Sequence, residues 1–247
     1  MPLNDLIGVV VIALAALLLL LPRARARGRK AVLRLAPPTQ RFLDAASRAL
    51  ERGEGLHVSL GDASMAAPWS ASAWVGLEAY RQSAPVAVLG DTPGALTSGD
   101  GGFALLAQEA IRRAALAQPL QHLHPSELGY LAGPSPSLYV AGALLELDER
   151  PYGAQLLLGH FSPLATLLVS DAGTQGIGQL VASDALPAQA AFALMTPDAL
   201  AGEELFAVPA AVGERGSAAH GLLVEDVLRA LLILSLVLGC LFELFKP

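Results

Sequence analysis

Polar residues that could bind a ligand follow two apolar runs in the first half of this chain. Ser59 lies near the end of the run 56–61 and Asp62 follows it, while Gly90 ends the run 85–90 and Asp91 follows it. Open α/β sheets bind ligands at the carboxyl ends of parallel strands. The four residues are therefore candidates for lining a small-molecule pocket. In the alternative reading, Ser59 and Asp62 simply cap the following turn.

Glu203 and Glu204 are adjacent carboxylates in an otherwise apolar stretch. Paired acids can share a proton or bind a cation, so both are kept as pocket candidates. The pattern favours a simpler role, because glutamates in the first turn of a helix stabilise its positive dipole end.

Histidines and serines do not form a recognisable catalytic or metal motif. His122 and His124 have i, i+2 spacing, but nothing local supplies the further ligands that zinc requires, so no metal site is expected. No G-x-S-x-G elbow is present. We assign no catalytic residue and favour a protein that is not an enzyme, while leaving the question open.

The glycine-rich stretch with Gly173, Gly176 and Gly178 does not match a dinucleotide loop. Such a loop lies between a strand and the start of a helix, whereas these glycines follow an expected helix and precede an expected strand. We interpret them as a helix end with tight turns. The chain has only two lysines, Lys30 and Lys246, and neither belongs to a Walker-type loop, so no cofactor is expected.

The elements that would position these residues alternate between strand and helix. Expected strands cover 56–61, 85–90, 120–123, 154–160, 176–183 and 190–196. Expected helices cover 39–52, 70–83, 103–118, 137–147 and 163–172, with another beginning at 202 and a loop at 91–102. The order predicts one α/β domain: a mostly parallel, Rossmann-like sheet with helices on both faces.

Both ends of the chain are apolar and uncharged, at 6–21 and 230–242. We expect two transmembrane helices that flank the α/β domain. Positive charges follow the first run instead of preceding it, which indicates an uncleaved anchor. The expected boundaries are 1–22 for the first anchor, 23–38 for a basic linker, 39–221 for the α/β domain and 222–247 for the second helix. Alternatively, the last helix lies on the membrane surface.

Charge predicts the topology and excludes one class of partner. The linker has six positive charges and no acid: Arg23, Arg25, Arg27, Arg29, Lys30 and Arg34. Such a run binds anionic lipid headgroups and stays cytoplasmic. We therefore expect the cell inner (plasma) membrane, with the domain in the cytoplasm and the N-terminus outside. Residues 35–221 have 18 acidic and 8 basic side chains, a net charge of −10 that argues against nucleic acid.

Several short motifs in the sequence are similar to those of one bacterial protein family. They are LHVSLG at 56–61, PVAVLG at 85–90, LLAQEAIRRA at 105–114, SLYVAG at 137–142, DAGTQGIGQLVAS at 171–183 and GEELFA at 202–207. The chain resembles an uncharacterised family of two-span membrane proteins with a domain of unknown function, over about residues 30–235. The resemblance implies the two-span topology and no activity. The chain departs from the pattern at 97–102, an insertion, and at Pro209, which is expected to interrupt a helix.

Two classes of function remain. The first is a membrane-anchored, non-catalytic scaffold or interaction protein that forms a homo-oligomer or joins other membrane proteins. The second is a membrane-bound enzyme or small-ligand sensor with its pocket at the carboxyl ends of the strands. A large apolar surface on the domain would favour the first class. A site with shifted carboxylate pKa values would favour the second.

Overall fold

The computed structural model describes residues 36–87, 91–117, 125–213 and 232–233. The described residues from 36 to 213 belong to one compact unit, which we call the α/β body. Among the described residues, no helix has both the length and the apolar character needed to cross a membrane. The apolar runs 6–21 and 230–242 lie outside these residues, apart from 232 and 233.

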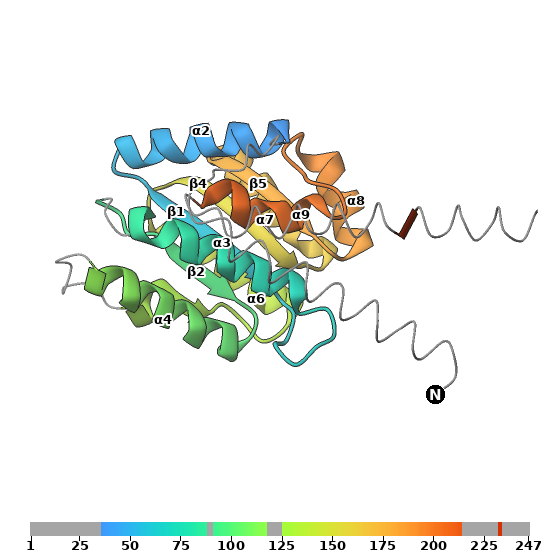
Figure 1. Cartoon of the computed structure of the whole chain (residues 1–247), viewed down its shortest axis with the longest axis horizontal. Helices are drawn as coiled ribbons and strands as arrows, with labels where there is room; N and C mark the ends of the chain where they lie inside the picture. The colour runs from blue at the N-terminus through green and yellow to red at the C-terminus, as the bar shows by residue number, and fades with distance from the viewer. Residues whose placement is uncertain (1–35, 88–90, 118–124, 214–231, 234–247) are drawn as a thin grey trace, which may run out of the picture. The chain divides into compact units, whose positions relative to one another are not determined.

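Within the described residues, five strands form one sheet in which every pairing is parallel (Figure 1). The strands are β1 (Gly55–Gly61), β2 (Ala95–Ser98), β3 (Gly129–Leu131), β4 (Tyr152–His160) and β5 (Gly178–Ser183). Their spatial order is β3-β2-β1-β4-β5. The chain thus starts in the middle, builds outward to β3, and then crosses back to place β4 on the other side of β1. This order matches the first five strands of doubly wound nucleotide-binding folds.

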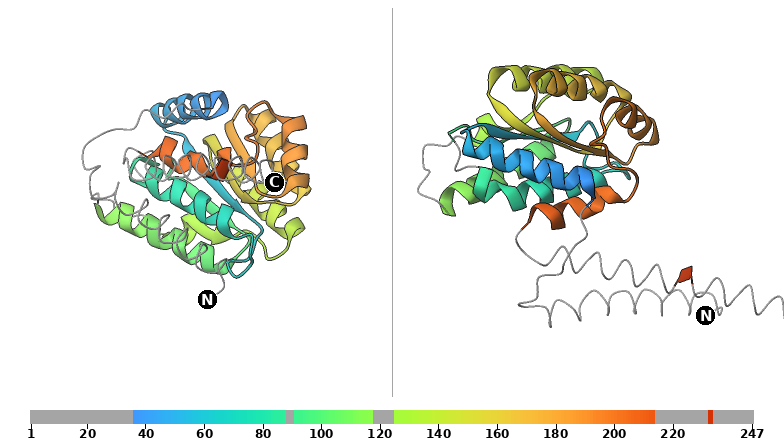
Figure 2. Two further views of the ribbon diagram at one scale, coloured as in Figure 1. Left: turned by 45° about the vertical axis from the view of Figure 1, so that its right-hand side comes forward. Right: turned by 90° about the horizontal axis from the view of Figure 1, so that it is seen from above.

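Helices cover both faces of the sheet, as the sequence predicts (Figure 2). One face carries α2 (Pro37–Glu51), α3 (Ala71–Ala87), α4 (Gly101–Ala117) and α9 (Glu204–Val212). The other face carries α6 (Pro136–Glu149), α7 (Thr166–Gln175) and α8 (Leu186–Met195). The short α5 (Pro125–Leu128) and the 3₁₀ turn η1 (Pro163–Ala165) complete the described helices. Each layer has its own apolar core, so the sheet is buried on both sides.

Two helix ends show how local sequence shapes the fold. Asp100 accepts the Gly102 N–H at its Oδ1 with a distance of 2.8 Å, and so caps the start of α4. At the end of α7, Gly176 adopts a left-handed conformation with a φ of 73°, and the Ile177 N–H bonds the Ala172 carbonyl. The predicted helix end with tight turns is therefore confirmed for the glycine-rich stretch.

The predicted strand at 85–90 is wrong over residues 85–87, because α3 continues to Ala87. Ala84 and Ala87 are both buried at helical spacing, and a short apolar run fits either a strand or a helix end. Gly90 lies outside the described residues. The second strand, β2, comes instead from the segment 91–102, where flanking proline and glycine suggested a loop.

Other differences affect short or uniformly apolar segments. The predicted strand at 190–196 is wrong: α8 covers it, and Ala188 and Phe192 pack into the core at i, i+4 spacing. The three-residue strand β3 was not predicted, and the run 120–123 lies outside the described residues. Pro209 does not end α9, which continues to Val212.

Candidate functional site

The sheet has one position where neighbouring strands continue in opposite directions, between β1 and β4. Connections leave β1 toward β2 and leave β4 toward β5, so the loops after these two strands diverge. Ligands of open α/β sheets bind at such a switch point, outside the carboxyl ends of the strands. A ligand site is therefore expected among the residues that follow β1, β4 and β5.

Two glycines let the ends of β1 and β4 approach unusually closely. A Cβ at Gly159 would lie 1.8 Å from the Leu60 carbonyl oxygen, and Gly61 has a φ of +83° that favours glycine. The pairing register is irregular between Ser59 and Gly61. Beyond it, the Asp62 N–H donates to the His160 carbonyl at 3.0 Å. This bond fixes the first residue after β1 beside the last residue of β4.

Four side chains gather at this end of the sheet: Asp62, Trp69, His160 and Asp184. We call them the polar edge. His160 Nδ1 lies 2.7 Å from Asp184 Oδ1, with both side chains partly exposed. The Trp69 ring lies over the imidazole, with ring centroids 5.6 Å apart. Asp184 therefore fixes the orientation of the ring, and the other nitrogen, Nε2, is the one that a ligand could use.

Asp62 is half-buried, and its pKa is raised above the ordinary carboxyl value. Burial is the main cause, because it disfavours the charged form. The neighbouring His160 and Ser162 act in the opposite direction without cancelling the effect. Asp62 is thus a carboxylate whose ionisation is incompletely compensated by the protein.

Asp100, at the end of β2, has a structural role instead. It accepts hydrogen bonds from the Ser64 hydroxyl at 3.1 Å and from amides in the first turn of α4. Burial works to raise the pKa of Asp100, but hydrogen bonds from Ser64 and from the Met65, Gly102 and Phe103 amides hold it below the ordinary value. The carboxylate oxygens of Asp100 therefore accept hydrogen bonds from the start of α4 and from the β1–α3 loop.

The structure separates the site residues that the sequence predicts. Asp62 alone belongs to the polar edge. Ser59 is fully buried, and its hydroxyl bonds the Tyr139 hydroxyl, which also accepts the Gly61 N–H at 3.0 Å. The hydrogen bond to Tyr139 of α6 accounts for the Ser59 hydroxyl better than a bound ligand or a turn cap does.

Asp91, Glu203 and Glu204 lie elsewhere in the described residues. The Asp91 side chain lies beside Gly53, and Gly53 belongs to the turn that leads into the amino end of β1. Glu203 and Glu204 are exposed at the start of α9, where the helix dipole favours carboxylates. The basic residues at positions 23, 25, 27, 29, 30 and 34, together with Gly90, His122 and His124, fall outside the described residues.

Trp69, His160 and Asp184 were not among the predicted site residues, although the sequence carries a usable signal for two of them. His160 ends the predicted strand 154–160, and Asp184 follows the predicted strand 176–183. Carboxyl ends of parallel strands meet at one edge of a sheet. The same rule that selected Asp62 therefore applies to these residues. Trp69 had no such signal, because its position depends on the path of the β1–α3 loop.

A second notable surface lies on α8, whose sequence LPAQAAFALM has no charged residue. The exposed residues of this helix are all apolar, and we call them the α8 face: Leu186, Pro187, Ala190, Ala193, Leu194 and Met195. Leu186 is 75 % exposed and Leu194 is 89 % exposed. Exposed Leu164 and Leu167 belong to η1 and α7, which both pack against α8. Helices that are apolar on all sides are normally covered.

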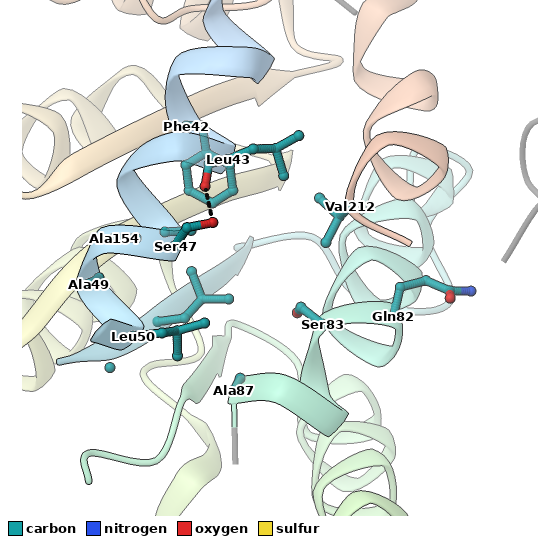
Figure 3. Close-up of a pocket in the computed structure, with 13 residues that line it drawn as sticks. Phe42, Leu43, Ser47, Ala49, Leu50, Gln82, Ser83, Ala87, Ala154 and Val212 are labelled. Atoms are coloured by element: carbon teal, nitrogen blue, oxygen red, sulfur yellow. Dashed lines mark hydrogen bonds between the residues drawn. The ribbon is translucent and has the colours of Figure 1, made fainter. Parts of the chain in front are cut away.

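An apolar pocket of about 150 Å³ lies beside the amino end of β1, the end opposite to Asp62. Figure 3 shows the side chains that line it. It is bounded by α2, α3 and the end of α9, with Gly55 and Leu56 of β1 in its wall. The hydroxyls of Ser47 and Ser83 donate to carbonyls of their own helices. Specific ligand sites combine apolar walls with converging polar groups, so this pocket gives no chemical selectivity.

Neither a metal site nor a phosphate loop is indicated. Among the described residues, no three His, Cys, Asp or Glu side chains are arranged to hold a metal ion. The β1–α3 connection, residues 62–70, contains no glycine, whereas dinucleotide folds carry their glycines there. Comparison with protein-family models, curated proteins and solved structures found no match.

Proposed function

We propose that this chain is a membrane-anchored, non-catalytic interaction protein that self-associates through the α8 face. The observation that carries the proposal is the exposure of Leu186 and Leu194 on a helix without charge. Large apolar surfaces on soluble bodies are typical of interaction sites. Burying a leucine side chain contributes about 1.5–3 kcal/mol, so several of them supply a useful association energy.

A second copy fits the α8 face better than a lipid surface does. Residues 151–213 include five acids and no lysine or arginine, so this part of the body is not attracted to anionic headgroups. Ala190 and Ala193 are small, which lets the backbones of two helices approach closely. Two identical uncharged faces related by a two-fold axis meet without like-charge repulsion.

Membrane anchoring supports the same proposal from the two ends of the chain. The uncharged runs 6–21 and 230–242 would confine the body to the plane of the membrane, with residues 23–34 against anionic headgroups on the cytoplasmic side. Confinement raises the effective concentration of a partner copy.

The topology is tested with sealed inner-membrane vesicles. Protease added to their cytoplasmic side should digest the body, and full protection of the body there would reject this topology.

The test of self-association is native mass spectrometry of the full chain in lipid nanodiscs or mild detergent. We expect the unsubstituted protein to be a defined multimer. Leu194→Glu should weaken association at least tenfold, or by about 1.4 kcal/mol, because a carboxylate would be buried against an apolar face. The side chain is 89 % exposed in the body, so folding should be unaffected.

Leu116→Glu is the matched control, because Leu116 is 70 % exposed on α4, which covers the opposite face of the sheet. This variant should assemble like the unsubstituted protein. A monomeric unsubstituted protein would reject the proposal. So would a multimer that Leu194→Glu leaves intact, since association would then depend on another surface.

The alternative is a small-ligand sensor, and one observation favours it. The raised pKa of Asp62 marks a shifted carboxylate at the carboxyl ends of the strands, which is the signature expected of that class. A ligand site on the sheet edge and a contact surface on α8 are compatible, because they use different residues.

A further inference from the structure

We propose that the polar edge binds an organic cation, an ammonium or guanidinium group attached to a flat apolar moiety. The ligand would lie outside the carboxyl ends of β1, β4 and β5, with its charge near Asp62 and Asp184 and its apolar part against Trp69. This inference is independent of self-association through the α8 face.

The distribution of charge selects the sign of the ligand. The polar edge offers two carboxylates, and the three loops at this edge, 62–70, 161–165 and 184–185, have no lysine or arginine. An anion at this edge would meet two carboxylates with no lysine or arginine to balance them, whereas a cation would be attracted.

Asp62 supplies a specific reason for a cationic ligand. Burial raises its pKa by disfavouring the charged carboxylate, and the opposing effect of the neighbouring His160 does not cancel this. A cation bound beside Asp62 would provide the missing counter-charge and favour the ionised form. The ligand would therefore gain more binding free energy from the Asp62 carboxylate than from a fully solvated carboxylate on the surface.

Trp69 and His160 select an organic cation. The Trp69 side chain is 51 % exposed, although it lies over the imidazole of His160. An indole ring attracts cations through its π face and also provides apolar contact. His160 is oriented by Asp184 through Nδ1, which leaves Nε2 to exchange a hydrogen bond with the ligand. Two carboxylates, an oriented imidazole and an open indole together fit a cationic group attached to a flat apolar moiety.

The test is a charge series of one molecular shape: 2-phenylethylamine, 2-phenylethanol and phenylacetate. Each is titrated by calorimetry into the full chain in zwitterionic lipid nanodiscs, with empty nanodiscs as the blank. We expect the amine to bind at least tenfold more tightly than the alcohol, and phenylacetate not to bind. Affinity for the amine should fall as salt is added, because part of the attraction is electrostatic.

Asp62→Asn separates a binding role from a structural one. The substitution should weaken amine binding at least tenfold, while the free energy of unfolding stays the same or rises, because the cost of burying a charge disappears. Asp171→Asn removes the same charge from α7, where Asp171 bonds Gln175 at 2.8 Å. This control should bind the amine normally.

Three results would overturn the proposal. They are equal binding of the amine and the alcohol, binding of phenylacetate, and unchanged affinity in Asp62→Asn. Leu194→Glu should bind the amine like the unsubstituted protein, so a failure of self-association is distinguishable from a failure of ligand binding.

Discussion

Acidification from pH 7 to pH 4 is expected to remove about 3 kcal/mol from the unfolding free energy of the body through His57 alone. Burial lowers the pKa of His57 from an ordinary value of 6.5 to about 3. The folded state therefore rejects a proton that the unfolded state accepts. The stabilisation is complete above pH 6.5 and is lost as pH falls toward 3.

The surroundings of His57 explain why the ring stays neutral. Its side chain is fully buried in β1, with Nε2 3.0 Å from Thr97 Oγ1 and Nδ1 3.3 Å from the Gln155 amide nitrogen. Both ring nitrogens therefore have a hydrogen-bond partner while the ring is neutral. Tyr152 packs against the ring and directs its hydroxyl to Glu146. No carboxylate contacts the imidazole to stabilise a second proton.

Urea titrations followed by tryptophan fluorescence would measure this effect. Both tryptophans, Trp69 and Trp74, lie in the body, so the signal reports on the body within the full chain. His57→Gln keeps a donor and an acceptor but does not titrate. Its unfolding free energy should fall less steeply with acid, by about 1.4 kcal/mol per pH unit between pH 6.5 and 4. Parallel curves for the two proteins would contradict the prediction.

The helix expected at 103–118 and the strands expected at 56–61, 154–160 and 176–183 all appear. The helix was predictable from its helical spacing of apolar residues, and the strands from short apolar runs next to glycines. Residues 85–87 and 190–195 did not follow the prediction. Their uniformly apolar sequences carry no period, and tertiary packing of residues such as Ala87 and Phe192 decided their structure.

The candidate site was only partly predictable from the sequence. The rule that parallel sheets bind ligands at strand ends selected Asp62, which the structure places beside His160 at the carboxyl ends of β1 and β4. Asp91 does not lie there, because residues 85–87 belong to α3 and Asp91 contacts Gly53, before the amino end of β1. Ser59 shows a different limit. Sequence gives its position on β1, but only the packing of α6 reveals that Tyr139 covers it.

Replacing Gly159 with alanine is expected to destabilise the body by about 3 kcal/mol or more, at the upper end for added volume in a packed interior. A Cβ there would lie 1.8 Å from the Leu60 carbonyl oxygen and 2.4 Å from its carbon. Both are backbone atoms in the central pair of strands, so no side-chain rotation can relieve the clash. β1 and β4 would have to separate next to the irregular register at Ser59 and Gly61.

Gly173→Ala is the matched control, because Gly173 lies in α7 and a Cβ there meets only Gln179 Nε2, at 3.8 Å. Alanine in the helix should stabilise the body by about 0.5–1 kcal/mol. Urea titrations of both variants compare the same added methyl group in two environments.

Separation of the strands at Gly159 would also break the hydrogen bond from the Asp62 N–H to the His160 carbonyl. Amine binding should therefore fall together with stability in Gly159→Ala, whereas in Asp62→Asn it falls alone. Equal stability of the two glycine variants would mean that the close approach of β1 and β4 does not hold the polar edge together.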